Sequence, residues 1–175
     1  MKNSDINYLL ELGLKNHQEN KLDKAVYYYD EVIKENKENI EANLYLGVVF
    51  VQQRKFIEAK TQFEKTLNVS PKNIDALNNL GLVYRELNEI DNSIDCFKKV
   101  IAINSNFVTS YNNLSILYQN AKKYSEAEKI LIKALDIDPN NLEIKLSLAI
   151  LYKDILQFEK SKILFLEILD KNPKN

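Results

Sequence analysis

The sequence contains very few of the residues that make tight turns. It has three glycines, three prolines and no tryptophan in 175 residues. Sandwiches and barrels of β-strands need turn residues at short, regular spacing, so this scarcity argues against them and favours helices. Hydrophobic residues make up 45% of the chain and charged residues 28%, a composition typical of a globular protein that buries a core.

An excess of charge of either sign is also absent. Lys and Arg number 24, Asp and Glu number 25, and the formal net charge is −1. A dedicated nucleic-acid-binding protein needs surplus positive charge to displace counterions, so we expect no nucleic-acid partner. No apolar run reaches the roughly 18 residues of a membrane span, and the N-terminus lacks the apolar core of a signal peptide. We expect a cytoplasmic protein.

Residues that carry chemistry are scarce as well. Cys96 is the only cysteine and His17 the only histidine. No intrachain disulfide can form, which favours a reducing compartment, and no histidine-rich metal site is available. We interpret Cys96 as a packing residue and His17 as a solvated one. With no glycine-rich phosphate loop, we expect no catalytic residues, no metal and no cofactor, and the chain is predicted not to be an enzyme.

What the sequence does contain is a pattern that repeats every 34 residues. A small residue recurs at this interval five times: Ala25, Ala59, Ser93, Ala127 and Ser161. A second series is Leu12, Leu46, Leu80, Leu114 and Leu148, and a third is Pro71, Pro139 and Pro173. The pattern predicts a single domain of five repeats after a leader at residues 1–5: 6–39, 40–73, 74–107, 108–141 and 142–175.

Each repeat has the apolar spacing of two helices. In the third repeat we predict helices over residues 75–87 and 91–103. Asp91, Asp23 and Ser125 are predicted to cap the second helix of their repeats. Gly81 and Ser93 are small enough to let the two helices approach closely where they cross. One pair cannot bury its apolar face alone, so neighbouring pairs must stack.

These residues resemble the tetratricopeptide repeat, in which W-x₂-L-G-x₂-Y is followed by A-x₃-F and P. The second repeat gives the matching series Asn43, Leu46, Gly47, Phe50, Ala59, Phe63 and Pro71. The departures are local, such as Asn16, Lys37 and Lys145. The resemblance implies an all-α, right-handed superhelical solenoid of antiparallel helix pairs. It also implies a concave groove, lined by the first helix of each repeat, that holds a peptide or protein segment.

Groove residues follow from that resemblance and from the helical spacing. We expect them to be Leu10, Leu14, Leu44, Tyr45, Val48, Asn78, Asn79, Leu82, Arg85, Asn112, Asn113, Ile116, Gln119, Asn120 and Ile150. Asparagine amides can bond the backbone of an extended peptide without reading its side chains. Asn79 and Asn113 are similar in position to the asparagine ladder in the repeats of protein O-linked N-acetylglucosamine transferases. The match lapses at Tyr45 and Ser147, and an alternative is that the chain is simply rich in asparagine.

A second comparison is negative. Repeat domains that hold acidic chaperone tails use a clamp of Lys, Arg and Asn. The corresponding positions here are Leu10, Leu14, Tyr45, Asp75 and Asn79, so we do not expect that clamp. The apolar residues at both ends and the amides between them would suit an extended or partly helical segment.

Three functions remain open. The leading hypothesis is a non-catalytic module for protein–protein interaction that binds a peptide or protein segment in the groove. The second is the N-terminal, substrate-recruiting part of a larger enzyme of the glycosyltransferase or sulfotransferase type. The third is a scaffold that self-associates through an uncapped C-terminal repeat, because residues 142–175 carry more apolar side chains than two helices can bury.

Overall fold

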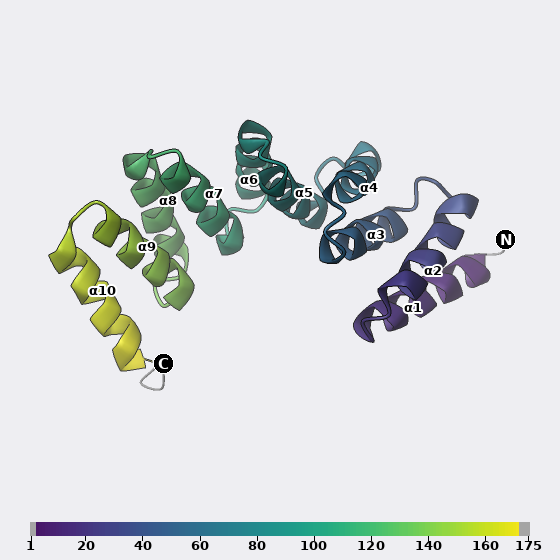
Figure 1. Cartoon of the computed structure of the whole chain (residues 1–175), viewed down its shortest axis with the longest axis horizontal. Helices are drawn as coiled ribbons and strands as arrows, with labels where there is room; N and C mark the ends of the chain where they lie inside the picture. The colour runs from purple at the N-terminus through teal and green to yellow at the C-terminus, as the bar shows by residue number, and fades with distance from the viewer. Residues whose placement is uncertain (1–2, 172–175) are drawn as a thin grey trace. The chain divides into compact units, whose positions relative to one another are not determined.

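The computed structural model describes residues 3–171, and over that range it contains helices joined by short turns and no strand (Figure 1). The helices are α1 (Asn3–Gln18), α2 (Leu22–Glu35), α3 (Ile40–Gln52), α4 (Phe56–Val69), α5 (Ile74–Glu86), α6 (Ile90–Ile103), α7 (Val108–Asn120), α8 (Tyr124–Ile137), α9 (Leu142–Asp154) and α10 (Phe158–Lys171). The all-α prediction is confirmed. Pro173, the last member of the proline series, lies outside the described residues.

Two helices form in every repeat, as the spacing predicts. In the third repeat they are Ile74–Glu86 and Ile90–Ile103, so each predicted boundary is correct to within one residue. The helix α1 begins at Asn3 and therefore includes part of the predicted leader.

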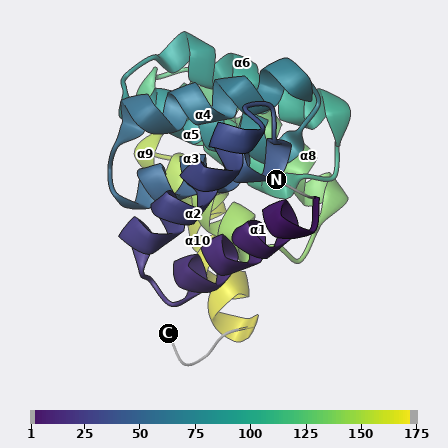
Figure 2. The same cartoon turned by 90° about the vertical axis from the view of Figure 1, so that its right-hand side faces the viewer.

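The chain divides into two compact units, one extending to Cys96 and the other beginning at Phe97. In unit 1, α1 packs on α2 and α3 on α4, while α2 and α4 pack on the first helix of the next pair. The pairing of α1 with α2 is visible in two views (Figures 1 and 2). The first helices also contact one another, α1 with α3 and α3 with α5. A row of first helices therefore forms one surface of this unit.

The core of unit 1 consists of two clusters between helix pairs. Tyr29 and Val32 of α2 pack against Leu46 and Val49 of α3 and are fully buried. Phe63 of α4 occupies the same place one repeat later, in a cluster that contains Cys96. The interpretation of Cys96 as a packing residue is confirmed.

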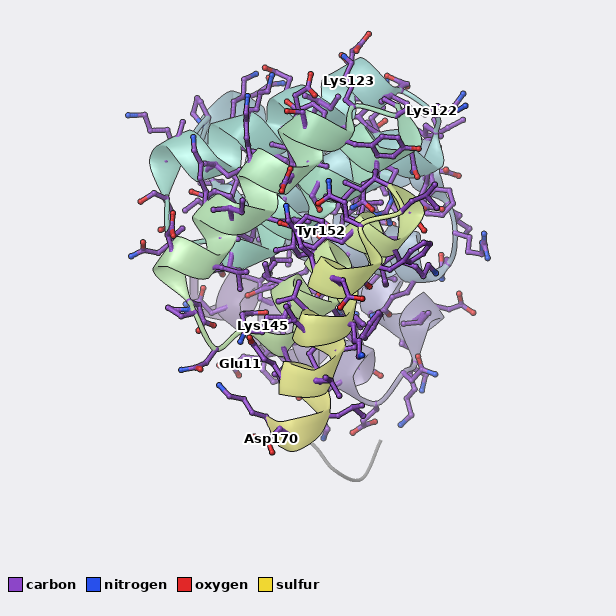
Figure 3. The ribbon with its side chains drawn as sticks, turned by 90° about the vertical axis from the view of Figure 1, so that its left-hand side faces the viewer. Glu11, Lys122, Lys123, Lys145, Tyr152 and Asp170 are labelled. Atoms are coloured by element: carbon purple, nitrogen blue, oxygen red, sulfur yellow. The ribbon has the colours of Figure 1, made fainter. Side chains whose placement is uncertain are left out.

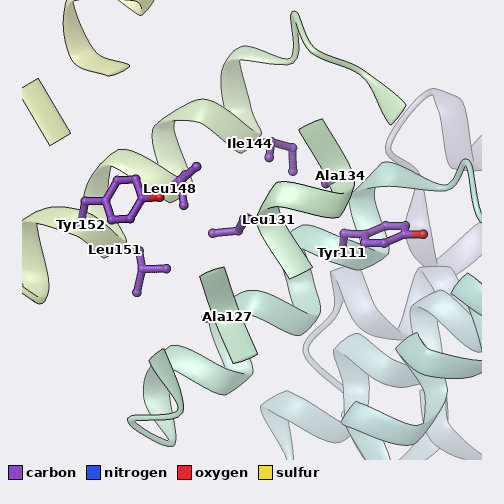
Figure 4. Packing of buried hydrophobic residues seen from close by; sticks show 8 residues of the cluster. All are labelled: Tyr111, Ala127, Leu131, Ala134, Ile144, Leu148, Leu151 and Tyr152. Carbon is purple, nitrogen blue, oxygen red and sulfur yellow. The ribbon is translucent and has the colours of Figure 1, made fainter. Parts of the chain in front are cut away.

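Unit 2 repeats this packing with different residues (Figure 4). Leu131 and Ala134 of α8 are fully buried, and they share a cluster with Ile144, Leu148 and Leu151 of α9. The first helices α7 and α9 again contact each other.

The turn inside each repeat has one left-handed residue at the same position. Those residues are Asn20, Arg54, Asn88, Lys122 and Leu156, with φ between 56° and 62°. In the third repeat the amide of Glu89 donates to the carbonyl of Tyr84 at 2.8 Å, which closes the Schellman turn that ends the first helix. The five repeats therefore share a backbone turn conformation as well as a residue pattern.

The predicted caps of the second helices are wrong. The helices α2 and α8 begin at Leu22 and Tyr124, so Asp23 and Ser125 lie inside their first turns. Asp91 likewise follows the first residue of α6. The residues that precede α2 and α8 are lysines with no side-chain cap bond, because the left-handed turn leads the chain directly into the helix.

Asparagines instead cap three of the first helices, α3, α5 and α9. The Oδ1 atoms of Asn39, Asn73 and Asn141 accept hydrogen bonds from the amides of Ala42, Ala76 and Ile144 at 2.8, 2.9 and 3.1 Å.

Close contact at the helix crossings is confirmed. The hydroxyl of Ser93 donates to the carbonyl of Gly81 at 2.7 Å, and Ser161 donates to Ala149 at 2.8 Å. A larger side chain at either serine would separate the two helices.

Candidate peptide-binding surface

The first helices of unit 1 carry nine of the predicted groove residues. They are Leu10 and Leu14 on α1, Leu44, Tyr45 and Val48 on α3, and Asn78, Asn79, Leu82 and Arg85 on α5. Eight of them are half-buried, whereas Leu10 is only 6% exposed and belongs to the core. We call the eight half-buried residues the first-helix surface.

Two hollows open on this part of unit 1. One, of about 370 Å³, lies between α1 and α3 and is lined by Asn7, Leu10, Glu11, Leu14 and Glu41. The other, of about 330 Å³, is lined by Val51, Arg54, Phe56, Leu82, Val83, Arg85 and Glu86. Each contains two residues that the helical spacing placed in the groove. The hollows therefore lie where an occupant would contact those residues.

The side-chain amide of Asn79 already makes one hydrogen bond within the protein. Its Nδ2 donates to the carbonyl of Asp75 at 2.9 Å, one turn earlier in α5. This bond uses only the nitrogen, so it leaves both lone pairs of the amide oxygen able to accept hydrogen bonds. The side chain is thus oriented by its own helix before any ligand arrives.

Unit 2 carries the remaining six predicted residues. Asn113, Ile116 and Gln119 of α7 are half-buried, and Asn120 of α7 and Ile150 of α9 are exposed. Asn112 is 7% exposed, donates from Nδ2 to Glu143 Oε1 at 2.7 Å, and accepts from the Ser147 hydroxyl at 2.7 Å. Its amide therefore links α7 to α9 and is not available to a ligand in this structure.

The asparagine pairs belong to different units, Asn78 and Asn79 to unit 1 and Asn112 and Asn113 to unit 2. Within unit 2 the pair splits further, since Asn112 is bonded internally and Asn113 is the more exposed. Equivalent positions in two repeats thus have different surroundings.

Arg54 and Phe56 line a hollow but were missed as candidates. Arg54 lies in the turn between α3 and α4 and Phe56 is the first residue of α4, whereas helical spacing identified only residues on the first helices. The Arg54 guanidinium lies over the Phe56 ring, 6.0 Å from its centroid. A count of arginines could have found Arg54, because only two occur in the sequence.

A cluster of charged and aromatic groups joins α4 to the turn before α6. Lys60 Nζ lies 2.9 Å from Glu89 Oε1 and 4.9 Å from the centre of the Tyr84 ring. Its hydrogen bond lowers the pKa of Glu89, and Asn92 adds to the effect. The Tyr84 hydroxyl donates to Glu64 at 3.2 Å, and burial raises its pKa. The cluster links neighbouring repeats of unit 1.

His17 of α1 lies within hydrogen-bonding distance of α3, with Nε2 3.1 Å from Gln52 Oε1. Over residues 3–171, no group of three or more His, Cys, Asp or Glu side chains has the arrangement of a metal site. None of the helices that the structure describes is long and apolar enough to cross a membrane.

Comparison with known proteins identifies the repeats. Residues 74–107 and 107–137 match family models described as the tetratricopeptide repeat. No curated protein matches the sequence.

Solved structures with the same fold are numerous. MamA from Desulfovibrio magneticus RS-1 is 15% identical with a TM-score of 0.89, over 100% of this chain and 99% of that one. A repeat protein from Parabacteroides merdae is 21% identical with a TM-score of 0.89, over 98% and 68%. YrrB, described as "a TPR protein with an unusual peptide-binding site", is 20% identical with a TM-score of 0.77, over 95% and 86%. At these identities the likeness shows the fold.

Proposed function

We propose that this chain, a tetratricopeptide-repeat protein, is a non-catalytic interaction module that binds a peptide or protein segment on its first helices. One observation carries the proposal: both hollows on the first helices of unit 1 contain residues that repeat spacing assigned to a groove. Their walls combine apolar side chains with a few charged groups, as is typical of sites for short segments.

The first-helix surface suits an extended segment. Leu14, Leu44 and Val48 are half-buried and can still gain contact with a ligand's apolar side chains. Asn79 adds an amide held in place by its bond to Asp75. Apolar contacts would supply most of the affinity, and the amide would orient the bound backbone.

Affinity capture with matched variants tests this function. Leu14→Glu and Leu82→Glu place a charge in each hollow, and Asn79→Ala and Asn113→Ala remove the two amides. Ile57→Glu is the control, because Ile57 is 69% exposed on α4, a second helix. We expect wild-type protein and the control to retain the same binding partner and the Glu and Ala variants to lose it, with helical content unchanged by circular dichroism. Retention by every variant would contradict the proposal.

Self-association is a second candidate function, supported by the surface of α10, which lies in the foreground of Figure 3. Leu166 and Leu169 are 56% and 49% exposed, and Phe158 is 59% exposed. Phe165 and Ile168 are half-buried, although their equivalents Leu131 and Ala134 are fully buried under α9. The same face that holds a first helix elsewhere is therefore accessible here, and a second copy would cover it.

A further inference from the structure

The only two arginines of the chain line the same hollow. Of 24 Lys and Arg residues, Arg54 and Arg85 alone are arginine, and both border the 330 Å³ hollow of unit 1. They lie 31 positions apart in sequence, one in the turn after α3 and the other in the last turn of α5. The fold therefore brings together the two side chains best suited to bind a planar anion.

Neither guanidinium is tightly bound within the protein. Arg85 Nη2 lies 3.4 Å from Glu86 Oε1, longer than the 2.7–2.9 Å or so of a strong charge-assisted bond. The Arg54 guanidinium lies over the Phe56 ring, and this cation–π interaction uses none of its N–H groups as hydrogen-bond donors. Both side chains can therefore turn their donors toward a ligand without breaking a short ion pair.

We propose that this hollow binds a carboxylate of an acidic peptide segment, with a neighbouring apolar side chain of the segment against Val51, Phe56 and Leu82. This inference rests on the proposed function and names the chemistry of the partner. Arginine pairs with carboxylate through two parallel N–H···O bonds. The apolar walls require an apolar group beside the charge, which a peptide such as alternating leucine and glutamate supplies.

The charge of the hollow favours a carboxylate over a phosphate. Arg54 and Arg85 contribute two positive charges and Glu86 one negative charge, so one singly charged anion neutralises the site. A phosphate group carries nearly two negative charges at neutral pH, and Glu86 would repel the second. A nucleic-acid backbone is disfavoured for a further reason, since the whole chain is slightly negative.

A third hollow of unit 1 is lined by lysines instead of arginines. It has about 480 Å³ and is bordered by Lys34, Lys37 and Lys65 together with Asp30 and Glu38. Lys34 already lies 2.5 Å from Glu31. Three positive and two negative side chains border this hollow, so it is a suitable place for control substitutions.

Fluorescence anisotropy with a labelled peptide of alternating leucine and glutamate tests the proposal on the full chain. The matched peptide has glutamine at every glutamate. We expect saturable binding of the acidic peptide alone, weakened about tenfold by Arg54→Gln or Arg85→Gln. Arg85→Lys keeps the charge but loses the planar fork, so we expect an intermediate loss. Glu86→Gln should tighten binding, and Lys65→Gln, with the same charge change as the arginine variants, should leave it unchanged.

Three results would overturn the proposal: equal binding of both peptides, equal effects of Lys65→Gln and the arginine variants, or stronger competition by inorganic phosphate than by acetate. Absence of saturable binding up to about 1 mM peptide would also overturn it. Leu14→Glu distinguishes failure of the carboxylate site from failure of the proposed interaction function, because Leu14 borders the hollow between α1 and α3 and not the arginine hollow. If capture of a partner depends on Leu14 but the acidic peptide does not bind, the interaction function stands and the carboxylate site does not.

Discussion

The ring of Phe63 packs directly on the backbone of Gly47, where the two helices of the second repeat cross. A β-carbon added to Gly47 would lie 2.6 Å from Cε1 of Phe63. Gly13 and Tyr29 have the same relationship in the first repeat, at 2.5 Å. In the fourth repeat the equivalent residues are Ser115 and Leu131, so a larger residue on one helix accompanies a smaller one on the other.

Gly47→Ala should therefore destabilise the protein. Phe63 is fully buried and cannot move away without displacing its neighbours, so we expect a loss of about 1–3 kcal/mol in the free energy of unfolding. Phe63→Leu in the same chain should recover part of the loss, because leucine also faces a residue larger than glycine in the fourth repeat. Urea unfolding of the two single variants and the double variant measures the coupling. Strictly additive effects would mean that contact with the Phe63 ring is not what makes Gly47→Ala destabilising.

Leu156→Gly should stabilise the protein. Leu156 has φ of 62° and its side chain is 72% exposed, so it has an unfavourable backbone conformation and little burial to offset it. Glycine adopts this region freely, and we expect a gain of about 0.5–1 kcal/mol. Asn88→Gly is the control, since asparagine already tolerates the conformation and the gain should be smaller. Thermal unfolding monitored by circular dichroism provides the comparison, and equal shifts would contradict the explanation.

The fold was predictable because the repeat supplies many independent observations of each position. Five occurrences of Leu12 and its equivalents identify a buried position that a single helix would leave ambiguous. Capping was harder to predict, because Asp23 and Asn39 are both good capping residues and sequence does not reveal which turn is left-handed. The recurrence of asparagine at Asn39, Asn73 and Asn141 was the signal that was missed.

The candidate site was predictable only where helical spacing determines exposure. Leu14 and Leu82 lie in hollows as that spacing suggests, whereas Arg54 comes from a turn and carries no helical register. Asn112 was predicted to line the groove, but it is buried on α7 and its amide bonds Glu143 and Ser147 of the next repeat. Contacts between repeats vary from one repeat to the next, so a repeated pattern cannot specify them.

Asp30→Asn should change the pH dependence of stability. Burial raises the pKa of Asp30 above its ordinary value, although the Lys34 and Lys65 charges act in the opposite direction. The folded state therefore binds the proton more tightly than the unfolded state, and wild-type stability falls as pH rises from the unfolded pKa through the folded one. Asparagine does not titrate, so the variant does not lose stability over this pH range.

We expect the Asp30→Asn variant to have the higher melting temperature at pH 7 and no advantage below about pH 3, where both states of the wild-type carboxyl are protonated. Glu58→Gln, an exposed carboxyl on α4, is the control for removing a charge. Melting curves across this pH range are sufficient. An advantage that persists at low pH would have a cause other than proton binding.

Leu166→Lys combined with Leu169→Glu should prevent self-association if the α10 face mediates it. The pair introduces opposite charges into the apolar surface and leaves the net charge of the chain at −1. Wild-type protein should show a concentration-dependent sedimentation coefficient, and the variant should sediment as a monomer. Ile57→Lys, at an apolar position of α4 that is 69% exposed, should behave as wild type. A wild-type protein that is monomeric at every concentration would exclude this association.

Asn112→Ala should lower the free energy of unfolding, because Asn112 links two helices of the protein. Its removal leaves the Ser147 hydroxyl and the Glu143 carboxylate without the amide that each bonds at 2.7 Å, which costs about 1–3 kcal/mol in the free energy of unfolding. Adding Ser147→Ala should cost little more, because the two side chains act together. Asn113→Ala is the matched control, since Asn113 is a half-buried asparagine on the same helix, and its effect should stay within about 0.5 kcal/mol. If Asn112→Ala instead left stability unchanged and weakened partner binding, Asn112 would be a ligand-binding residue, and the link between α7 and α9 would have no structural role.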